Sequence, residues 1–182
     1  MKNTHIYVKR IGNFVSEIAG LRYEGSFPLR ASYIYSSAGP IPYKHALEAE
    51  FQPLEIGDKW GELWGSAWFR FEAEVPPSFA GHEVAALIDI GGEACLFEEG
   101  EPVLGLTSPP EKTSQYTRKR LVPLFPMARG GERVSLLVEG AANQLLGTRD
   151  AREFFLNQAE LTIIRRNVRD LYLDLAVLYK LM

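Results

Sequence analysis

Residues 67–75 alternate between apolar and polar side chains with a period of two, and no other feature of the sequence constrains the fold as strongly. One face of this segment carries Ala67, Phe69, Phe71, Ala73 and Val75, and the other face carries Trp68, Arg70, Glu72 and Glu74. Such an alternation predicts a half-buried antiparallel strand. Pro76 and Pro77 follow at once, and the strand is expected to end there because proline lacks the N–H that a ladder hydrogen bond requires.

Short apolar runs separated by glycine and proline continue after this strand. They cover residues 83–90, 94–97, 102–106, 115–124, 133–139 and 154–164. Strands at this spacing favour an all-β sandwich or barrel. Residues 98–101 read Glu-Glu-Gly-Glu, which is typical of a hairpin tip in which Gly100 supplies a positive φ.

Both ends of the chain show a helical period instead. Apolar side chains recur every three or four positions in residues 4–21 and again in residues 167–182, where Asn167 is the expected N-cap. The second helix is apolar beyond one stripe, so we expect it to contact a further partner, either another chain or a continuation of the polypeptide. Residues 22–43 mix proline, glycine and aromatic residues, and they are expected to form a loop that packs on the sandwich.

Composition excludes several classes of protein. With 182 residues and 46% hydrophobic content, the chain is too apolar for disorder and long enough for one core. A net charge of −3 argues against a nucleic-acid binder, and the basic run at residues 118–120 is expected to be a solvated strand or loop. No apolar stretch reaches the roughly 18 residues of a membrane span. The single Cys95 and the lack of a visible signal peptide favour a cytoplasmic location.

Motifs that would carry catalysis or bind a metal are not visible. Ser66 lacks the surroundings of a nucleophile elbow. The glutamates near the hairpin tip are expected to be solvated, because a glycosidase needs two carboxyl groups in different environments across a cleft. Zinc sites need several nitrogen or sulfur ligands at short spacing. His5, His45, His82 and Cys95 lie too far apart in the sequence to show such a spacing. We therefore predict no catalytic and no metal-binding residue.

Three tryptophans, Trp60, Trp64 and Trp68, recur every four residues. Aromatic rings can stack on sugars, but they also dominate cores and domain interfaces, and packing is the favoured interpretation. The exposure of these three side chains separates the two interpretations, because a sugar-binding surface needs exposed rings beside polar groups.

Several segments resemble, in the same order, segments of the family 38 glycoside hydrolases. Residues 60–71 (WGELWGSAWFRF) and residues 74–76 (EVP) resemble the WG…WF…VP pattern near the start of the α-mannosidases of the cytosolic or vacuolar, and bacterial, branch. Residues 92–97 and 100–107 are similar to the GEA…GEP…GLT segment of that family, and residues 139–147 to its E-x-A-x-N-x-x-x-G segment. The resemblance spans essentially the whole chain.

The resemblance implies a mainly β fold, namely a β-sandwich of the galactose-binding-like (jelly-roll) type with an N-terminal helix and a C-terminal helix. The expected division is residues 1–44 as helix and aromatic loop, residues 45–166 as sandwich, and residues 167–182 as the start of a helical linker to a catalytic domain. The zinc of the family is held by His and Asp residues that include an HxHxD-type motif, and this sequence lacks that motif. Zinc is therefore expected in the catalytic domain, and none in this chain.

The implied function is that of a non-catalytic N-terminal domain of a zinc-dependent retaining α-mannosidase in carbohydrate metabolism. The full-length parent would hydrolyse α-mannosides, whereas this chain alone would support the catalytic domain and assembly. Its expected partners are that catalytic domain, a further copy of the chain and carbohydrate, but neither nucleic acid nor a membrane. The alternatives are a carbohydrate-binding module and the equivalent sandwich domain of another multidomain glycosidase, with a free-standing enzyme least favoured.

Candidate residues for sugar or interdomain contacts follow from their expected positions. Trp68 and Arg70 share a strand face, on which a guanidinium can stack on an indole. Polar residues beside strand ends lie where the loops of a sandwich gather. The complete candidate set is Trp64, Trp68, Arg70, Glu93, Glu139 and Asn143.

Overall fold

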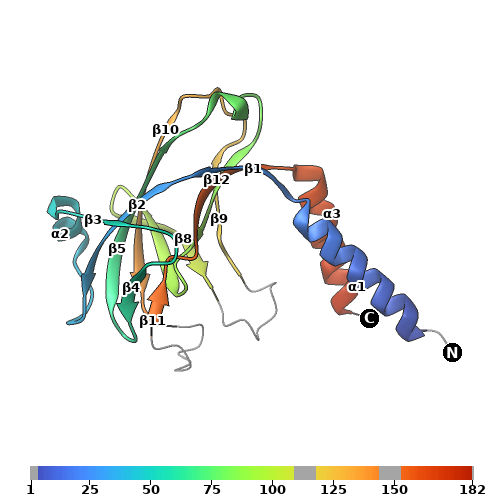
Figure 1. Ribbon diagram of the computed structural model, residues 1–182, viewed down its shortest axis with the longest axis horizontal. Helices are drawn as coiled ribbons and strands as arrows, with labels where there is room; N and C mark the ends of the chain where they lie inside the picture. Colours follow the sequence, from blue (N-terminus) through green and yellow to red (C-terminus); the bar gives the residue numbers. More distant parts are fainter. Residues whose placement is uncertain (1–3, 109–117, 144–152, 182) are drawn as a thin grey trace.

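The computed structural model describes residues 4–108, 118–143 and 153–181. Two antiparallel sheets pack against each other as a sandwich, and two helices extend from one side of it (Figure 1). This arrangement confirms the prediction of a mainly β sandwich with a helix at each end.

The two main sheets have four and six strands. The first contains, in spatial order, β1 (Tyr23–Pro28), β12 (Gln158–Ile164), β6 (Val84–Asp89) and β9 (Leu121–Phe125). The second contains β3 (Gln52–Leu54), β2 (Arg30–Ser36), β5 (Ser66–Glu74), β10 (Arg133–Ala141), β7 (Glu93–Glu98) and β8 (Glu101–Thr107). A separate pair is formed by β4 (Lys59–Glu62) and β11 (Glu153–Phe155). The helices are α1 (Thr4–Gly20), α2 (Tyr43–Glu48) and α3 (Arg166–Lys180), with a short 3₁₀ turn at Pro77–Phe79.

Strand β5 is the alternating segment of the sequence, and it lies inside the six-stranded sheet between β2 and β10. Its apolar face enters the core, where Phe69 and Phe71 are fully buried. Trp60 joins them: its ring lies edge-on to Phe69 at 5.0 Å between centroids, and its Nε1–H donates to the carbonyl oxygen of Ile90 at 2.6 Å. The core therefore includes both the predicted strand and the residues just before it.

The expectation of a loop at residues 22–43 is wrong, because this segment supplies β1 and β2, one strand to each sheet. Its breaker residues sit where strands tolerate them. Gly25 has φ +68° at the irregularity in the β1–β12 pairing, and Pro28 ends an edge strand. The boundary expected at residue 44 therefore does not separate the sandwich from what precedes it.

Helices α1 and α3 pack against each other through the buried side chains of Val15, Ile18, Tyr172 and Ala176. They lie together because α1 leads into β1 and α3 follows β12, and these strands are paired (Figure 1). Asn167 is not the N-cap as predicted: β12 runs almost directly into α3, and Arg165 occupies the capping position. One face of α3 is therefore covered by α1, and the expected contact with another chain or a continuation of the polypeptide stays a prediction.

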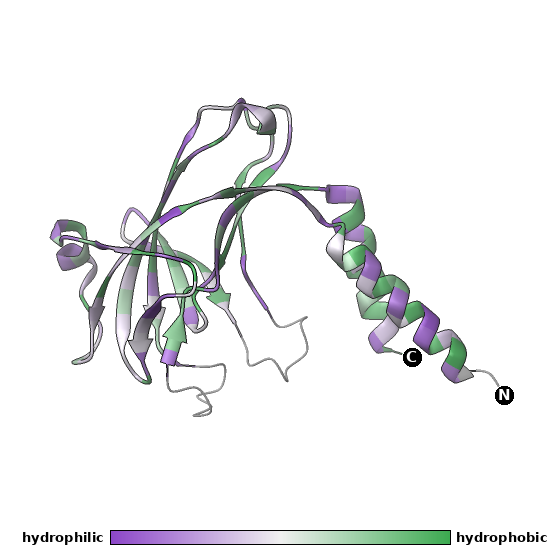
Figure 2. Ribbon diagram, viewed as in Figure 1, coloured by the Kyte–Doolittle hydropathy of each residue, from purple (hydrophilic) through white to green (hydrophobic). Residues whose placement is uncertain are grey.

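The outer faces of this helix pair remain partly apolar. Figure 2 shows hydrophobic residues along both helices as well as within the strands. The large exposed hydrophobic side chains on the two helices are Ile6, Tyr7, Phe14, Leu171, Leu173, Val177 and Leu178.

Candidate functional site

A pocket of about 400 Å³ lies at one end of the interior strands of the six-stranded sheet, and we call it the rim pocket. Three strands end or begin there, because Ala141 at the end of β10 pairs with Ser66 at the start of β5 and with Glu93 at the start of β7. The side chains around the opening include Trp64, Ser66, Glu93, Cys95, Glu139 and Asn143.

Trp64 is held at this rim in an unusual backbone conformation. Its φ is +73°, in the left-handed region that costs a non-glycine residue roughly 1–2 kcal/mol. The turn is fixed by hydrogen bonds, since the N–H of Trp64 donates to Ala142 O and the N–H of Ala142 donates to Gly65 O, both at 2.8 Å. The side chain is 55% exposed, so the turn presents an indole ring at the surface.

Glu139 and Cys95 face each other across the β10–β7 pair. Burial raises the pKa of the Glu139 carboxyl group, which favours its protonated form. Burial also raises the pKa of the Cys95 thiol, and the nearby Glu139 adds to this effect. A thiol with a raised pKa is not an activated nucleophile, so Cys95 contributes a small side chain to the pocket rather than reactivity.

Asn143 lines the rim pocket and carries an unpaired hydrogen-bond acceptor. Its Oδ1 is buried and has no hydrogen-bond partner among the described residues. Leaving a buried polar atom unpaired costs about 1–3 kcal/mol. A ligand or neighbouring segment that carries an N–H or O–H group would remove that cost.

Four of the six candidate residues therefore meet in the rim pocket: Trp64, Glu93, Glu139 and Asn143. Trp68 does not, because α2 and the segment before it cover its face of the strand. Its Nε1–H donates to Ile41 O at 2.7 Å, and its ring lies 4.9 Å from that of Phe97, centroid to centroid. Trp68 is only 1% exposed, so it is a packing residue.

Arg70 lies outside the rim pocket as well. The shared strand face suggests that its guanidinium stacks on Trp68, but it stacks over the ring of Phe51 instead, at 4.3 Å from the ring centroid. Trp68 is already covered by aromatic neighbours such as Tyr43, and Phe51, just before the edge strand β3, reaches the guanidinium instead. Trp60 is also buried, in the core. Of the three regularly spaced tryptophans, Trp64 is therefore the exposed one.

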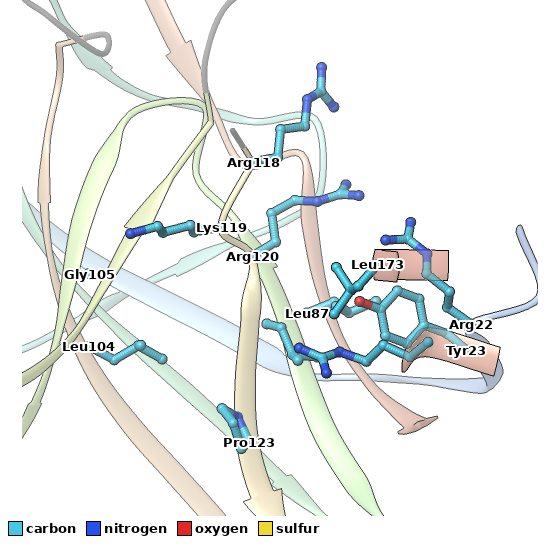
Figure 3. A pocket seen from close by; sticks show the side chains of 12 residues that line it. Arg22, Tyr23, Leu87, Leu104, Gly105, Arg118, Lys119, Arg120, Pro123 and Leu173 are labelled. Atoms are coloured by element: carbon cyan, nitrogen blue, oxygen red, sulfur yellow. The ribbon is translucent and has the colours of Figure 1, made fainter. Parts of the chain in front are cut away.

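A second and larger pocket, which we call the basic pocket, was not predicted from the sequence. It has a volume of about 600 Å³ and is lined by α3, by Arg22 and Tyr23 at the start of β1, and by the strands β6, β8 and β9 (Figure 3). Its cationic side chains are Arg22, Arg118, Lys119, Arg120 and Arg169. The run at residues 118–120 is expected from the sequence to be a solvated strand or loop, but Arg118 and Arg120 are partly buried. Arg22 and Arg169 are too distant in sequence to have indicated the cluster.

The described residues do not offer a metal centre. Among residues 4–108, 118–143 and 153–181, no three His, Cys, Asp or Glu side chains gather in a way that could hold a metal ion. The zinc that the family resemblance implies therefore has no fitting ligand set in this part of the chain. In the same residues, no helix has the length and apolar character to cross a bilayer.

Comparison of the sequence with known proteins identifies α-mannosidases as relatives of this chain. The chain is 31% identical over 194 residues to Alpha-mannosidase 2C1 of Homo sapiens and covers 98% of itself but 18% of that protein. It is 35% identical over 147 residues to the Mus musculus protein of the same name, covering 76% of itself and 14% of the relative. Alpha-mannosidase G of Dictyostelium discoideum is 24% identical over 196 residues, covering 98% and 18%.

The chain thus spans less than a fifth of the length of these relatives. A family model described as "Alpha-mannosidase, jelly roll domain", of the Ams1-like type, matches residues 27–162. The matched region runs from the end of β1 into β12 and so includes strands of both main sheets. The sandwich is therefore of the predicted jelly-roll type, and the chain belongs to the family of Ams1-like α-mannosidase jelly-roll domains.

Proposed function

We propose that this chain is a non-catalytic N-terminal domain of a cytoplasmic, zinc-dependent, retaining α-mannosidase of glycoside hydrolase family 38. The family match over residues 27–162 carries this proposal, together with the small share of each α-mannosidase relative that the chain covers. The zinc and the catalytic carboxylates would then belong to another part of the parent polypeptide. The parent would hydrolyse α-mannosides in carbohydrate metabolism.

The role proposed for the domain itself is to support the catalytic domain and the assembly of the parent through the rim pocket. Trp64 supports this role, because exposed tryptophans are enriched among the residues that dominate interface energies. The unpaired Oδ1 of Asn143 and the partly buried Glu139 support it too, since both would gain from a partner that donates hydrogen bonds.

Binding of carbohydrate is the second candidate function of the same pocket. An exposed indole beside Glu93, Glu139 and Asn143 has the combination of ring and polar groups that sugar recognition requires. The burial of Trp60 and Trp68 limits such a surface to one ring, so the interdomain role is favoured.

Hydrolysis of a nitrophenyl α-mannoside tests the assignment of the domain. We expect no turnover by this chain with or without added zinc, and chelator-sensitive turnover by the full-length parent. A parallel assay with a nitrophenyl β-galactoside serves as the control for the other multidomain glycosidases. Turnover of the α-mannoside by the chain alone, abolished by a chelator, would contradict the proposal.

Replacing Trp64 separates the two roles of the rim pocket. In the full-length parent, Trp64→Ala should lower kcat/KM or the Tm of the parent, whereas the Tm of the isolated chain should hardly change because the side chain is exposed. Met127→Ala, at an exposed position outside the pocket, is the control. If the parent carrying Trp64→Ala behaved like this control, the interdomain role would be wrong.

A titration of the isolated chain with α-mannobiose examines the carbohydrate alternative. Because Trp60 and Trp68 are buried, a change in tryptophan fluorescence would report on Trp64. Saturable quenching that disappears in Trp64→Ala would favour sugar binding over the interdomain role. No quenching, combined with an effect of Trp64→Ala in the parent, would favour the interdomain role.

A further inference from the structure

The basic pocket gathers five cations in a chain whose net charge is −3. They come from three separate parts of the sequence: Arg22 precedes β1, residues 118–120 precede β9, and Arg169 lies on α3. Like charges brought together repel one another, more strongly where water is partly excluded. The fold therefore concentrates positive charge at this place against the average of the chain.

The contacts of the described residues leave much of this charge without a counter-charge. Arg120 donates from Nη1 to Gln158 Oε1 at 2.9 Å and lies 4.0 Å from Asp89 Oδ2. Arg169 lies 3.5 Å from Asp170 Oδ1. Among the described residues that line the pocket there is no carboxylate.

Arg22 is held in place by its contacts, and Arg118 has an unsatisfied donor. The guanidinium of Arg22 stacks over the ring of Tyr172 at 4.2 Å and donates from Nε to Ala19 O, so its position is fixed. The Nε of Arg118 is buried and has no hydrogen-bond partner among the described residues. A buried guanidinium N–H without an acceptor is costly, and an anion in the pocket would satisfy it.

The basic pocket is large enough for a small molecule. Its volume of about 600 Å³ falls within the usual range for ligand sites, roughly 300–1,000 Å³. Figure 3 shows Arg118 and Arg120 on the segment that leads into β9, with Arg22 and Tyr23 approaching from the helix side. Leu87, Leu104 and Leu173 supply apolar lining between them.

We propose that the basic pocket is a binding site for a small organic phosphate ester. Guanidinium groups bind phosphate oxygens through paired hydrogen bonds, and Arg118, Arg120 and Arg169 would hold the phosphate. The apolar lining and Tyr23 would contact the organic part. This site is separate from the rim pocket and does not depend on the α-mannosidase assignment.

Calorimetric titration of the purified chain tests the proposal, with glucose 6-phosphate, pyrophosphate and inorganic phosphate as probes. We expect glucose 6-phosphate to bind more tightly than inorganic phosphate, with an affinity that falls as ionic strength rises. Arg118→Gln and Arg169→Gln should each weaken binding about tenfold, because each removes a charged hydrogen-bond donor. A thermal shift with the same probe should show stabilisation of the native chain.

Arg133→Gln is the matched control, because it removes one positive charge from an exposed position on β10, away from the basic pocket. Circular dichroism of each variant confirms that it is folded. Absence of binding to the native chain, or equal weakening by Arg133→Gln, would overturn the proposal. Citrate binding as tightly as glucose 6-phosphate would overturn the choice of phosphate. A single-stranded oligonucleotide binding far more tightly would replace the small ligand with a nucleic acid.

Discussion

The sandwich and the helix pair of this chain are stabilised on very different scales. In the sandwich, both sheets contribute large side chains to one core, and Trp60, Phe69 and Phe71 are almost completely buried. In the described part of the helix pair, the buried cluster consists of Val15, Ile18, Tyr172 and Ala176. Burying a large apolar side chain contributes about 1.5–3 kcal/mol, so most of the folding free energy resides in the sandwich.

The helix pair depends on attachments to the sandwich as much as on its own packing. The N–H of Arg165 donates to Arg22 O at 2.9 Å. This bond joins the start of α3 to the turn between α1 and β1. Arg166 forms an ion pair with Glu83, next to the first residue of β6. Regions with few buried contacts open locally at a lower free energy than the whole fold. We therefore expect the helices to open while the sandwich remains folded.

Trp60→Ala should give the largest effect, because it attacks the core of the sandwich. It creates a cavity beside Phe69 and removes the donor to the carbonyl oxygen of Ile90. The expected loss in the free energy of unfolding is about 3–5 kcal/mol, measured by urea denaturation. Trp64→Ala, at the exposed tryptophan, should stay within about 0.5 kcal/mol of the native chain. Equal losses in the two variants would refute the assigned burial.

Tyr172→Ala should have an intermediate and local effect. It removes the largest buried side chain of the helix pair and the ring beneath the guanidinium of Arg22, at a cost of about 2 kcal/mol. Hydrogen exchange should accelerate in α1 and α3 but not in the strands. Tyr7→Ala, on the exposed face of α1, is the control. If the strands lost protection equally, the helix pair and the sandwich would unfold as one unit.

Glu139→Gln should have the smallest effect, and its sign depends on pH. Burial raises the pKa of this carboxyl group in the folded chain above its unfolded value, so the folded state binds the proton more tightly. The resulting stability is present below the unfolded pKa and is lost as the pH rises through the folded pKa. Near neutral pH the charged carboxylate is therefore a cost, and Glu139→Gln should raise the Tm slightly.

Below the ordinary pKa of a glutamate, the Glu139 carboxyl group of the native chain is neutral in both the folded and the unfolded state, so the Tm of Glu139→Gln and that of the native chain should converge. Glu101→Gln, at an exposed position on β8, controls for the change in net charge. A stability difference independent of pH would contradict the burial of the Glu139 carboxyl group.

The sequence predicted those parts of the fold in which local pattern and tertiary structure agree. The alternation along β5 and the hairpin tip at Gly100, with φ +91°, are examples, because each is determined by neighbouring residues. The strands β1 and β2 escaped prediction, since Gly25 and Pro28 resemble loop residues until the edge position of β1 is known.

The candidate site was predictable in part for the same reason. Glu93, Glu139 and Asn143 were placed near one another because strand ends meet at the rim of a sandwich. The different environments of Trp64 and Trp68 could not be predicted from their regular spacing. Trp64 lies exposed in a left-handed turn, whereas Trp68 is buried beneath α2. The basic pocket could not be predicted from the sequence, because Arg22 and Arg169 come together only after β1 and β12 have paired.

The pairing of β1 with β12 also determines when the helices can meet during folding. Tyr23 lies opposite Ile164, so the whole sandwich sequence separates the two strands that bring α1 and α3 together. The entropy of closing so long a loop must be overcome before any contact between the helices is gained. In a refolding time course, we expect Tyr172 to become buried only after the sheets have formed. The burial of the Tyr172 ring would then report specifically on the last step of folding.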